Sequence, residues 1–133
     1  MEPALAIFAP LLGKCFAATL APETVDRHCF TSVYDGAHVR DTHVVTAKGK
    51  PVYSGESVYS FDGKGLEFVY FNSMGGAGHG TATVQSGLLS YDLAMKAKPM
   101  AASQRFHGKW TIDAVGYTVA DDGQPARRFT LSR

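Results

Sequence analysis

The sequence has few cysteines, and this limits the disulfides and metal sites that could stabilise the protein. Only two cysteines, Cys15 and Cys29, occur among its 133 residues. Small secreted domains that depend on disulfides usually carry four or more, and structural zinc sites need closely spaced cysteine pairs. We therefore expect two reduced, buried thiols in a cytoplasmic protein.

Neither an excess of charge nor a long apolar run is present. Thirteen basic side chains face twelve acidic ones, for a net charge of +1. A nucleic-acid-binding surface needs a marked basic excess, so we expect no nucleic-acid partner. No apolar run approaches the roughly 20 residues of a membrane-spanning helix, so we expect no membrane partner. The apolar start, residues 4–12, follows Glu2 without any basic residue, which favours a structural helix over a signal peptide.

Glycine is abundant, and the spacing of apolar residues divides the chain into two parts. Leu5, Phe8, Leu11 and Leu12 recur at helical spacing, and Gly13 follows as a stop signal. From there on, apolar residues alternate with period two, in runs rich in Val, Tyr, Phe and Thr. These runs predict strands over residues 14–20, 25–34, 37–47, 51–61, 65–73, 79–86, 88–95, 101–110, 111–120 and 127–133.

The short, glycine-rich connections determine how these strands pair. Connections of a few residues make neighbouring strands antiparallel. A single open sheet of this size would leave exposed edges, which closure removes. We therefore predict one all-β domain over residues 1–133, a closed antiparallel up-and-down barrel of about eight to ten strands with a short N-terminal helix. A two-sheet sandwich is the alternative.

The Asp35-Gly36 turn gives the register of one hairpin, because this dipeptide favours a two-residue turn. If Tyr34 pairs with Ala37, then His28 lies opposite His43. The face that these histidines share carries Asp26, His28, Phe30, Ser32, Val39, Asp41, His43 and Val45. The other face carries Arg27, Cys29, Thr31, Val33, His38, Arg40, Thr42 and Val44.

A second hairpin, around residues 62–65, groups ring-bearing side chains in the same way. One face carries Tyr53, Ser57, Tyr59, Phe61, Phe68, Tyr70 and Asn72, while Glu56 falls on the other. A slip of one residue at Lys48–Lys50 would move the whole Tyr53 group to the opposite face.

Polar and aromatic residues interrupt both faces of these strands, unlike the faces of a fully packed core. A cavity with a few oriented polar groups would produce this pattern, because a ligand needs apolar lining and a small number of donors and acceptors. The alternative is a hydrogen-bonded or water-filled interior without a ligand. As the binding residues for a small apolar or amphipathic molecule we predict His28, Arg40, His43, Tyr53, Tyr59, Phe68, Tyr70 and Trp110.

Two other kinds of chemistry are open for the histidine-bearing face. His28 and His43, with Asp26 or Asp41 as a third ligand, would form a set of a kind that binds zinc or iron. The same groups could act as general base and partner in a small isomerase or hydrolase. The simpler interpretation is that both histidines hydrogen-bond to tyrosines inside the barrel or lie outside it, so we predict no metal.

Two further features have structural interpretations. Arg40 could pair with Glu56 across adjacent strands and hold a carboxylate ligand through its guanidinium group, but a purely structural ion pair is favoured. Residues 74–80 are rich in glycine but lack the ending of a phosphate-binding loop, and we expect a turn or flexible loop there.

A structural homodimer is a third functional alternative, beside carrier and enzyme.

Several segments together resemble a known family. They are Gly13-Lys14-Cys15 after the helix, the run Pro51–Asp62, the aromatic strand Glu67–Phe71 and Ser73–Gly76. This layout is similar to uncharacterised bacterial lipocalin-like proteins of the calycin superfamily, and it implies a ligand-binding barrel. Cys15 stands where lipocalins have a tryptophan, so their tryptophan–arginine packing does not carry over.

The C-terminal part resembles a second group of barrels. Residues 116–133 are faintly similar to haem-binding barrels of the nitrobindin type, in which a histidine near the C-terminus ligates iron. Pro125–Arg133 contains no histidine. We therefore expect no haem and no other cofactor.

Overall fold

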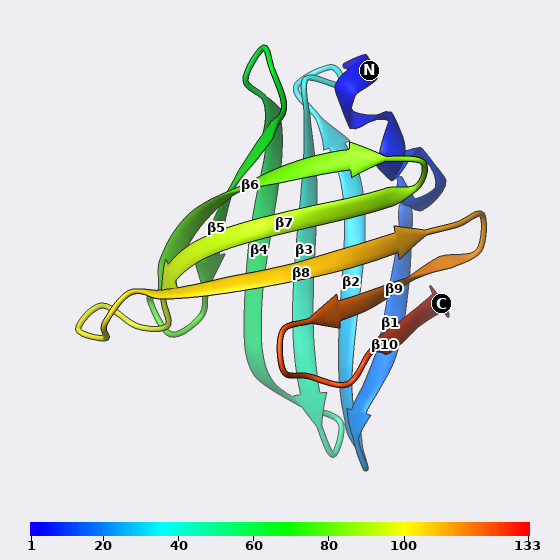
Figure 1. Cartoon of the computed structure of the whole chain (residues 1–133). Helices are drawn as coiled ribbons and strands as arrows, with labels where there is room; N and C mark the ends of the chain where they lie inside the picture. Colours follow the sequence, from blue (N-terminus) through cyan, green and yellow to red (C-terminus); the bar gives the residue numbers. More distant parts are fainter.

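The chain forms a closed antiparallel β-barrel with a short helix across one end (Figure 1). The computed structural model describes residues 1–133. The elements are the 3-10 helix η1 (Pro3–Leu11) and the strands β1 (Lys14–Ala21), β2 (Thr24–Val33), β3 (His38–Ala47), β4 (Lys50–Phe61), β5 (Leu66–Asn72), β6 (Ala77–Gln85), β7 (Leu88–Lys96), β8 (Gln104–Ile112), β9 (Gly116–Asp121) and β10 (Arg127–Ser132). No helical segment has the length and apolarity that crossing a membrane requires.

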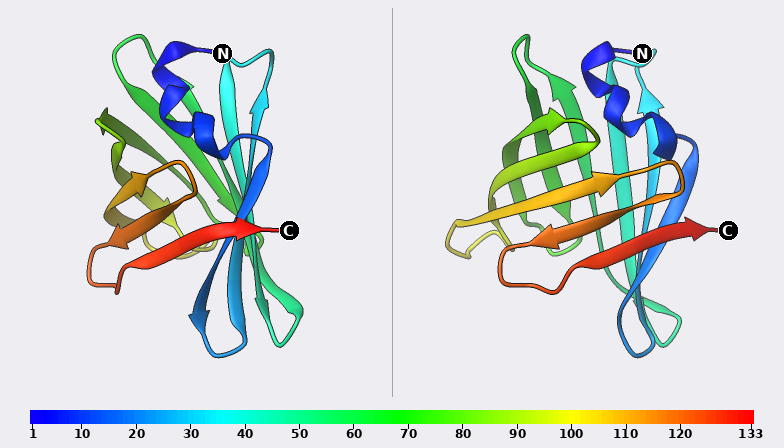
Figure 2. Two further views of the ribbon diagram at one scale, coloured as in Figure 1. Left: turned by 90° about the vertical axis from the view of Figure 1, so that its right-hand side faces the viewer. Right: turned by 45° about the vertical axis from the view of Figure 1, so that its right-hand side comes forward.

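Each strand pairs with its neighbours in sequence, and β1 pairs with β10 to close the barrel. Figure 1 shows β2 to β4 running upright behind β6 to β8, which cross them at a steep angle. The views in Figure 2 show the helix at the end of the barrel where the β4–β5 turn also lies. The predicted all-β barrel with an N-terminal helix is therefore confirmed, and closure excludes the sandwich.

The helix fits the barrel through a spacing of three residues. Leu5, Phe8 and Leu11 are each fully buried, and they recur at the period of a 3-10 helix. This period places the three side chains in one row facing the core. The Phe8 ring packs 4.7 Å from Tyr59 and 6.4 Å from Phe30, measured between ring centroids. The predicted helix is therefore present, in its tighter form.

Turn chemistry sets the register as predicted for the first hairpin. Asp35 and Gly36 both have positive φ, and the amide of Ala37 donates to the carbonyl of Tyr34 across the turn. His28 pairs with His43, as the sequence predicts.

The connection between β3 and β4 keeps the ring-bearing residues inside. A register shift between Val45 and Thr46 adds a residue to the pairing of the two strands, so that Val45 pairs with Tyr53. Tyr59 pairs with Phe68 in the next hairpin. The slip that would have turned the Tyr53 group outward does not occur.

The glycine-rich stretch 74–80 is mostly strand, so the predicted loop is wrong there. Only its first residues form a turn, and β6 begins at Ala77. A Cβ at Gly80 would lie 2.7 Å from the ring of Phe68 on the neighbouring strand. Small residues on the inner face of β6 therefore leave room for the aromatic rings of β5.

Two further predictions are corrected. The two strands predicted over 101–110 and 111–120 are present, but their bounds differ. β8 begins at Gln104 and continues to Ile112, and the turn falls at 113–115, where Asp113 accepts a hydrogen bond from Val115. Cys15 and Cys29 form a disulfide, because β1 and β2 pair with these two residues directly opposite each other. The expectation of reduced thiols is therefore wrong.

Candidate ligand site in the barrel interior

The barrel interior contains a hollow of about 240 Å³ that is partly open to solvent. We call it the interior cavity. Its sixteen lining residues are Asp26, His28, Asp41, His43, Ser57, Tyr59, Phe68, Tyr70, Tyr91, Leu93, Trp110, Tyr117, Val119, Asp121, Arg127 and Phe129. The volume is somewhat below the roughly 300–1,000 Å³ of pockets for drug-sized ligands. Only a small molecule fits inside.

Six inward-facing side chains from β2 to β5 form one continuous series of hydrogen bonds, which we call the histidine–aspartate chain. It runs in the order Asp41, His28, Asp26, His43, Tyr70 and Tyr53. Cross-strand pairing of His28 with His43 stacks the two imidazole rings 4.6 Å apart. These six side chains meet because antiparallel pairing brings alternate residues of three hairpins to the same face of the sheet.

His28 is the cationic centre of this chain. Its Nδ1 lies 2.7 Å from Oδ1 of Asp41 and its Nε2 lies 3.0 Å from Oδ2 of Asp26. Only a protonated imidazole can donate to both carboxylates. Burial alone lowers the pKa of His28, but the charge of Asp41 and the hydrogen bonds to both carboxylates outweigh it and raise that pKa to about 10.

Asp26 links the two histidines. Burial raises the pKa of its carboxyl group, but hydrogen bonds from His28 and His43 outweigh burial and hold that pKa well below its ordinary value. Nδ1 of His43 lies 3.0 Å from Oδ1 of Asp26. Asp26 therefore stays ionised, and each of its oxygens accepts from one imidazole.

The tyrosine end of the chain is uncharged. Nε2 of His43 lies 3.1 Å from the Tyr70 hydroxyl, which lies 2.5 Å from the hydroxyl of Tyr53. Burial and the hydrogen bond with Tyr53 raise the pKa of Tyr70, so its phenol keeps its proton. A neutral His43 satisfies every bond, since Nδ1–H donates to Asp26 and Nε2 accepts from Tyr70. Room for the Tyr70 hydroxyl comes from Gly55, where a Cβ would lie 2.6 Å from that oxygen.

A second polar group lies across the cavity, on β7, β9 and β10. The Tyr91 hydroxyl donates to Oδ1 of Asp121, and Nη2 of Arg127 donates to Oδ2 of the same carboxylate. Burial and the hydrogen bond to Asp121 raise the pKa of Tyr91, so this phenol also keeps its proton. Asp121 ends β9 and Arg127 begins β10, so the turn between these strands brings them together.

Two buried polar atoms, on residues that line the cavity, have no partner in the protein. They are the hydroxyl oxygen of Tyr117 and Nε of Arg127. Tyr117 is fully buried, and its ring lies between Trp110 at 4.8 Å and Phe129 at 4.7 Å, stacked on both. Packing on both sides fixes this ring, so its oxygen cannot move toward another partner.

The structure places most of the expected binding residues at the cavity. Six of the eight line it: His28, His43, Tyr59, Phe68, Tyr70 and Trp110. Tyr53 contributes through its bond to Tyr70. Arg40 does not belong to the site, because its side chain is 44% exposed on the outer wall, where Nε lies 3.4 Å from a carboxylate oxygen of Glu56. The favoured structural ion pair is therefore present, and the arginine of the cavity is Arg127.

The residues of the alternative metal-ligand set also come together. One ligand atom each of Asp26, His28 and His43 lies within 4.8 Å of the others. Hydrogen bonds among these atoms account for all three side chains without an ion, and His28 would have to lose its proton before it could bind one. We therefore interpret these three side chains as part of a hydrogen-bond network in which His28 is protonated.

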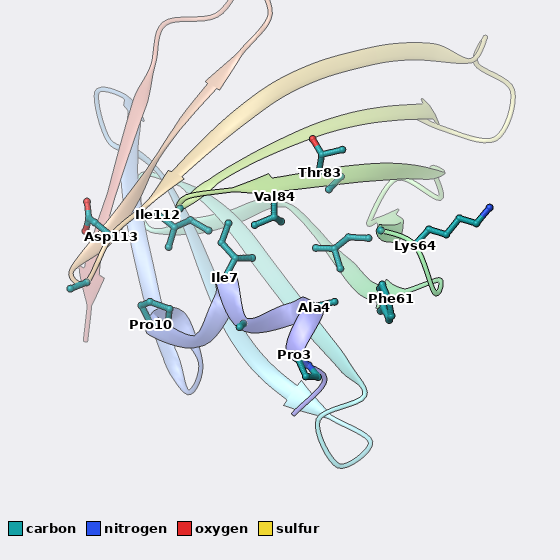
Figure 3. A pocket seen from close by; sticks show the side chains of 16 residues that line it. Pro3, Ala4, Ile7, Pro10, Phe61, Lys64, Thr83, Val84, Ile112 and Asp113 are labelled. Carbon is teal, nitrogen blue, oxygen red and sulfur yellow. The ribbon is translucent and has the colours of Figure 1, made fainter.

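A larger hollow of about 920 Å³ runs beside the helix (Figure 3). We call it the helix groove. Figure 3 shows Ile7 on the helix pointing toward Ile112 and Val84 on the barrel wall. Its charged lining residues, Lys64 and Asp113, lie well apart in Figure 3. The helix groove therefore lacks the converging polar groups that mark the interior cavity.

Comparisons with known proteins bear on the fold. No family model and no curated protein matches the chain. The chain is similar to the protein in "Crystal Structure of Rv2717c from M. tuberculosis", with a TM-score of 0.67 and 21% identity over 100% of this chain and 99% of that one. At this identity the likeness supports the barrel fold alone.

Proposed function

We propose that the protein binds a small amphipathic molecule inside its barrel. The supporting observation is the interior cavity, where aromatic walls surround a few fixed polar groups. A packed core would not hold two charged clusters and two unpartnered polar atoms around one hollow. On this proposal the protein is a lipocalin-like carrier of the calycin type.

A screen of small metabolites and fatty acids by thermal shift tests this function. Ligands that bind only the folded state raise its melting temperature. We expect at least one hit with the native protein, and none with Leu93→Trp, which fills the cavity. Val44→Trp on the outer wall is the matched control and should keep the hit. A response that survives Leu93→Trp, or no response to a broad library, would refute a cavity ligand.

A second function, general acid–base catalysis, is favoured by the unbroken histidine–aspartate chain. His28 cannot serve as the base, because two carboxylates hold it protonated. On this proposal the base is His43 acting through Tyr70. The Tyr70 hydroxyl gives its proton to Nε2 of His43 while its oxygen takes one from the substrate, and Asp26 orients the imidazole. Exchange of α-hydrogens of a small ketone for deuterium, followed by NMR, should then be faster with native protein than with His43→Gln. Equal rates would exclude this role.

A homodimer, a single-domain organisation and a bacterial source also remain proposals. So does a cytoplasmic location, against which the Cys15–Cys29 disulfide counts, since such bonds are rare in reducing compartments.

A further inference from the structure

The unpartnered atoms of Tyr117 and Arg127 define what a ligand must offer. Nε–H of Arg127 can only donate a hydrogen bond. The Tyr117 phenol keeps its proton, because burial and the nearby charges of Asp41 and Asp26 raise its pKa. Both groups therefore present donors that find no acceptor in the protein. A buried donor without an acceptor destabilises the free protein, and a ligand oxygen would remove that cost.

The charge of the cavity argues against an anionic ligand. Three carboxylates line it, from Asp26, Asp41 and Asp121, against two cations, protonated His28 and Arg127. With neutral His43, the sum is one negative charge. Arg127 is already neutralised by Asp121, so it offers a hydrogen bond without an unpaired positive charge. An ammonium ligand would satisfy the charge but supplies no acceptor for either donor.

The walls favour a flat ring. Seven of the sixteen lining residues are Phe, Tyr or Trp. Aromatic rings pack well against one another in stacked and edge-on arrangements, as the Trp110–Tyr117–Phe129 stack already does. A planar apolar body would suit these walls, and an oxygen on it would supply an acceptor of the kind that the two donors lack.

We propose that the ligand is an uncharged aromatic carbonyl compound whose oxygen accepts hydrogen bonds from Tyr117 and Arg127. This inference rests on the proposed function, because it names the ligand class of the same cavity. Acetophenone is the probe, with two matched compounds of similar size. Ethylbenzene lacks the oxygen, and benzoate replaces the ketone by a charged carboxylate.

Binding is measured by titration calorimetry or NMR on the native protein. We expect acetophenone to bind at least about tenfold more tightly than either matched compound, the difference that one buried hydrogen bond or one unpaired charge makes. Tighter binding of benzoate or ethylbenzene overturns the ligand class but leaves the proposed function standing. No binding of these or any other small molecule overturns the proposed function itself.

Variants separate a ligand role from a purely structural one. Tyr117→Phe removes the unpartnered hydroxyl, so the melting temperature of the free protein should rise by about 2–4 °C while acetophenone affinity falls about tenfold. Affinity for ethylbenzene should not change. Tyr34→Phe, at a tyrosine exposed on the outer turn, is the control and should alter neither quantity. A lower melting temperature for free Tyr117→Phe would show that internal water already satisfies the hydroxyl, and would overturn the assignment.

Arg127→Lys provides a second, independent variant. It keeps the positive charge beside Asp121 but removes the Nε–H donor. We expect weaker acetophenone binding with little change for ethylbenzene. Equal losses for both compounds would mean that the substitution acts through packing, against a hydrogen bond to the ligand.

Discussion

The protonated His28 between two carboxylates makes stability depend on pH in a definite direction. In the unfolded chain this imidazole loses its proton near its ordinary pKa of 6.5, whereas in the folded protein it keeps the proton up to a pKa of about 10. Between these two pKa values, folding takes up one proton. Each unit of rising pH therefore lowers the free energy of unfolding by about 1.4 kcal/mol. The contribution is complete below the unfolded pKa and is lost as pH rises through the folded one. Over the whole window the loss is on the order of 5 kcal/mol, a large part of a typical stability.

Urea unfolding at several pH values between about 6 and 9 measures this loss of stability. NMR titration of the His28 imidazole shows whether this residue is its source. Asp41→Asn removes one of the two carboxylates, so the pKa of His28 should fall, and the pH-dependent decline should end at a lower pH and have a smaller total. Asp35→Asn, in an exposed turn, is the control and should leave the slope unchanged. A stability that is flat over this range, or a His28 imidazole that titrates near its ordinary pKa, would refute the proposed charge state.

Three further predictions test the packing around the site. Gly80→Ala places a methyl group against the Phe68 ring and a backbone carbonyl, so urea unfolding should show a loss of about 1–3 kcal/mol, and a neutral effect would contradict the close approach. Phe8→Ala empties a fully buried position under the helix and should lower the free energy of unfolding by about 3–5 kcal/mol, whereas a loss below about 1 kcal/mol would mean that the helix does not stabilise the barrel. Cys15→Ser opens the disulfide to Cys29, whose sequence separation is 14, and should lower stability by up to about 3 kcal/mol; an unchanged unfolding curve in the presence and absence of reductant would contradict the bond.

The sequence predicts the histidine pair well because one turn controls it. Asp35-Gly36 allows a single favourable hairpin geometry, and alternation then carries the register down both strands to His28 and His43. The same alternation places Arg40 on the opposite face from these histidines, so its charge alone is not a reason to expect it in the interior. Period two is therefore a better guide to a site than the chemistry of a side chain alone.

Other parts of the site cannot be predicted from turn and alternation patterns. Tyr91, Asp121 and Arg127 meet across three strands, and the turn between β9 and β10 is long enough to permit several registers. The pairing of Cys15 with Cys29 depends on a bulge near the β1–β2 turn, where no glycine dipeptide specifies the geometry. Such contacts are set by closure of the whole barrel, and no local signal in the chain encodes them.

NMR shift mapping with acetophenone tests most directly whether the polar hollow is the functional site. We predict that the indole N–H of Trp110 and the resonances of inward-facing Tyr117 and His43 move on titration, while those of Arg40 on the outer wall do not. Shifts confined to the helix groove around Ile7, or to the outer wall, would contradict it.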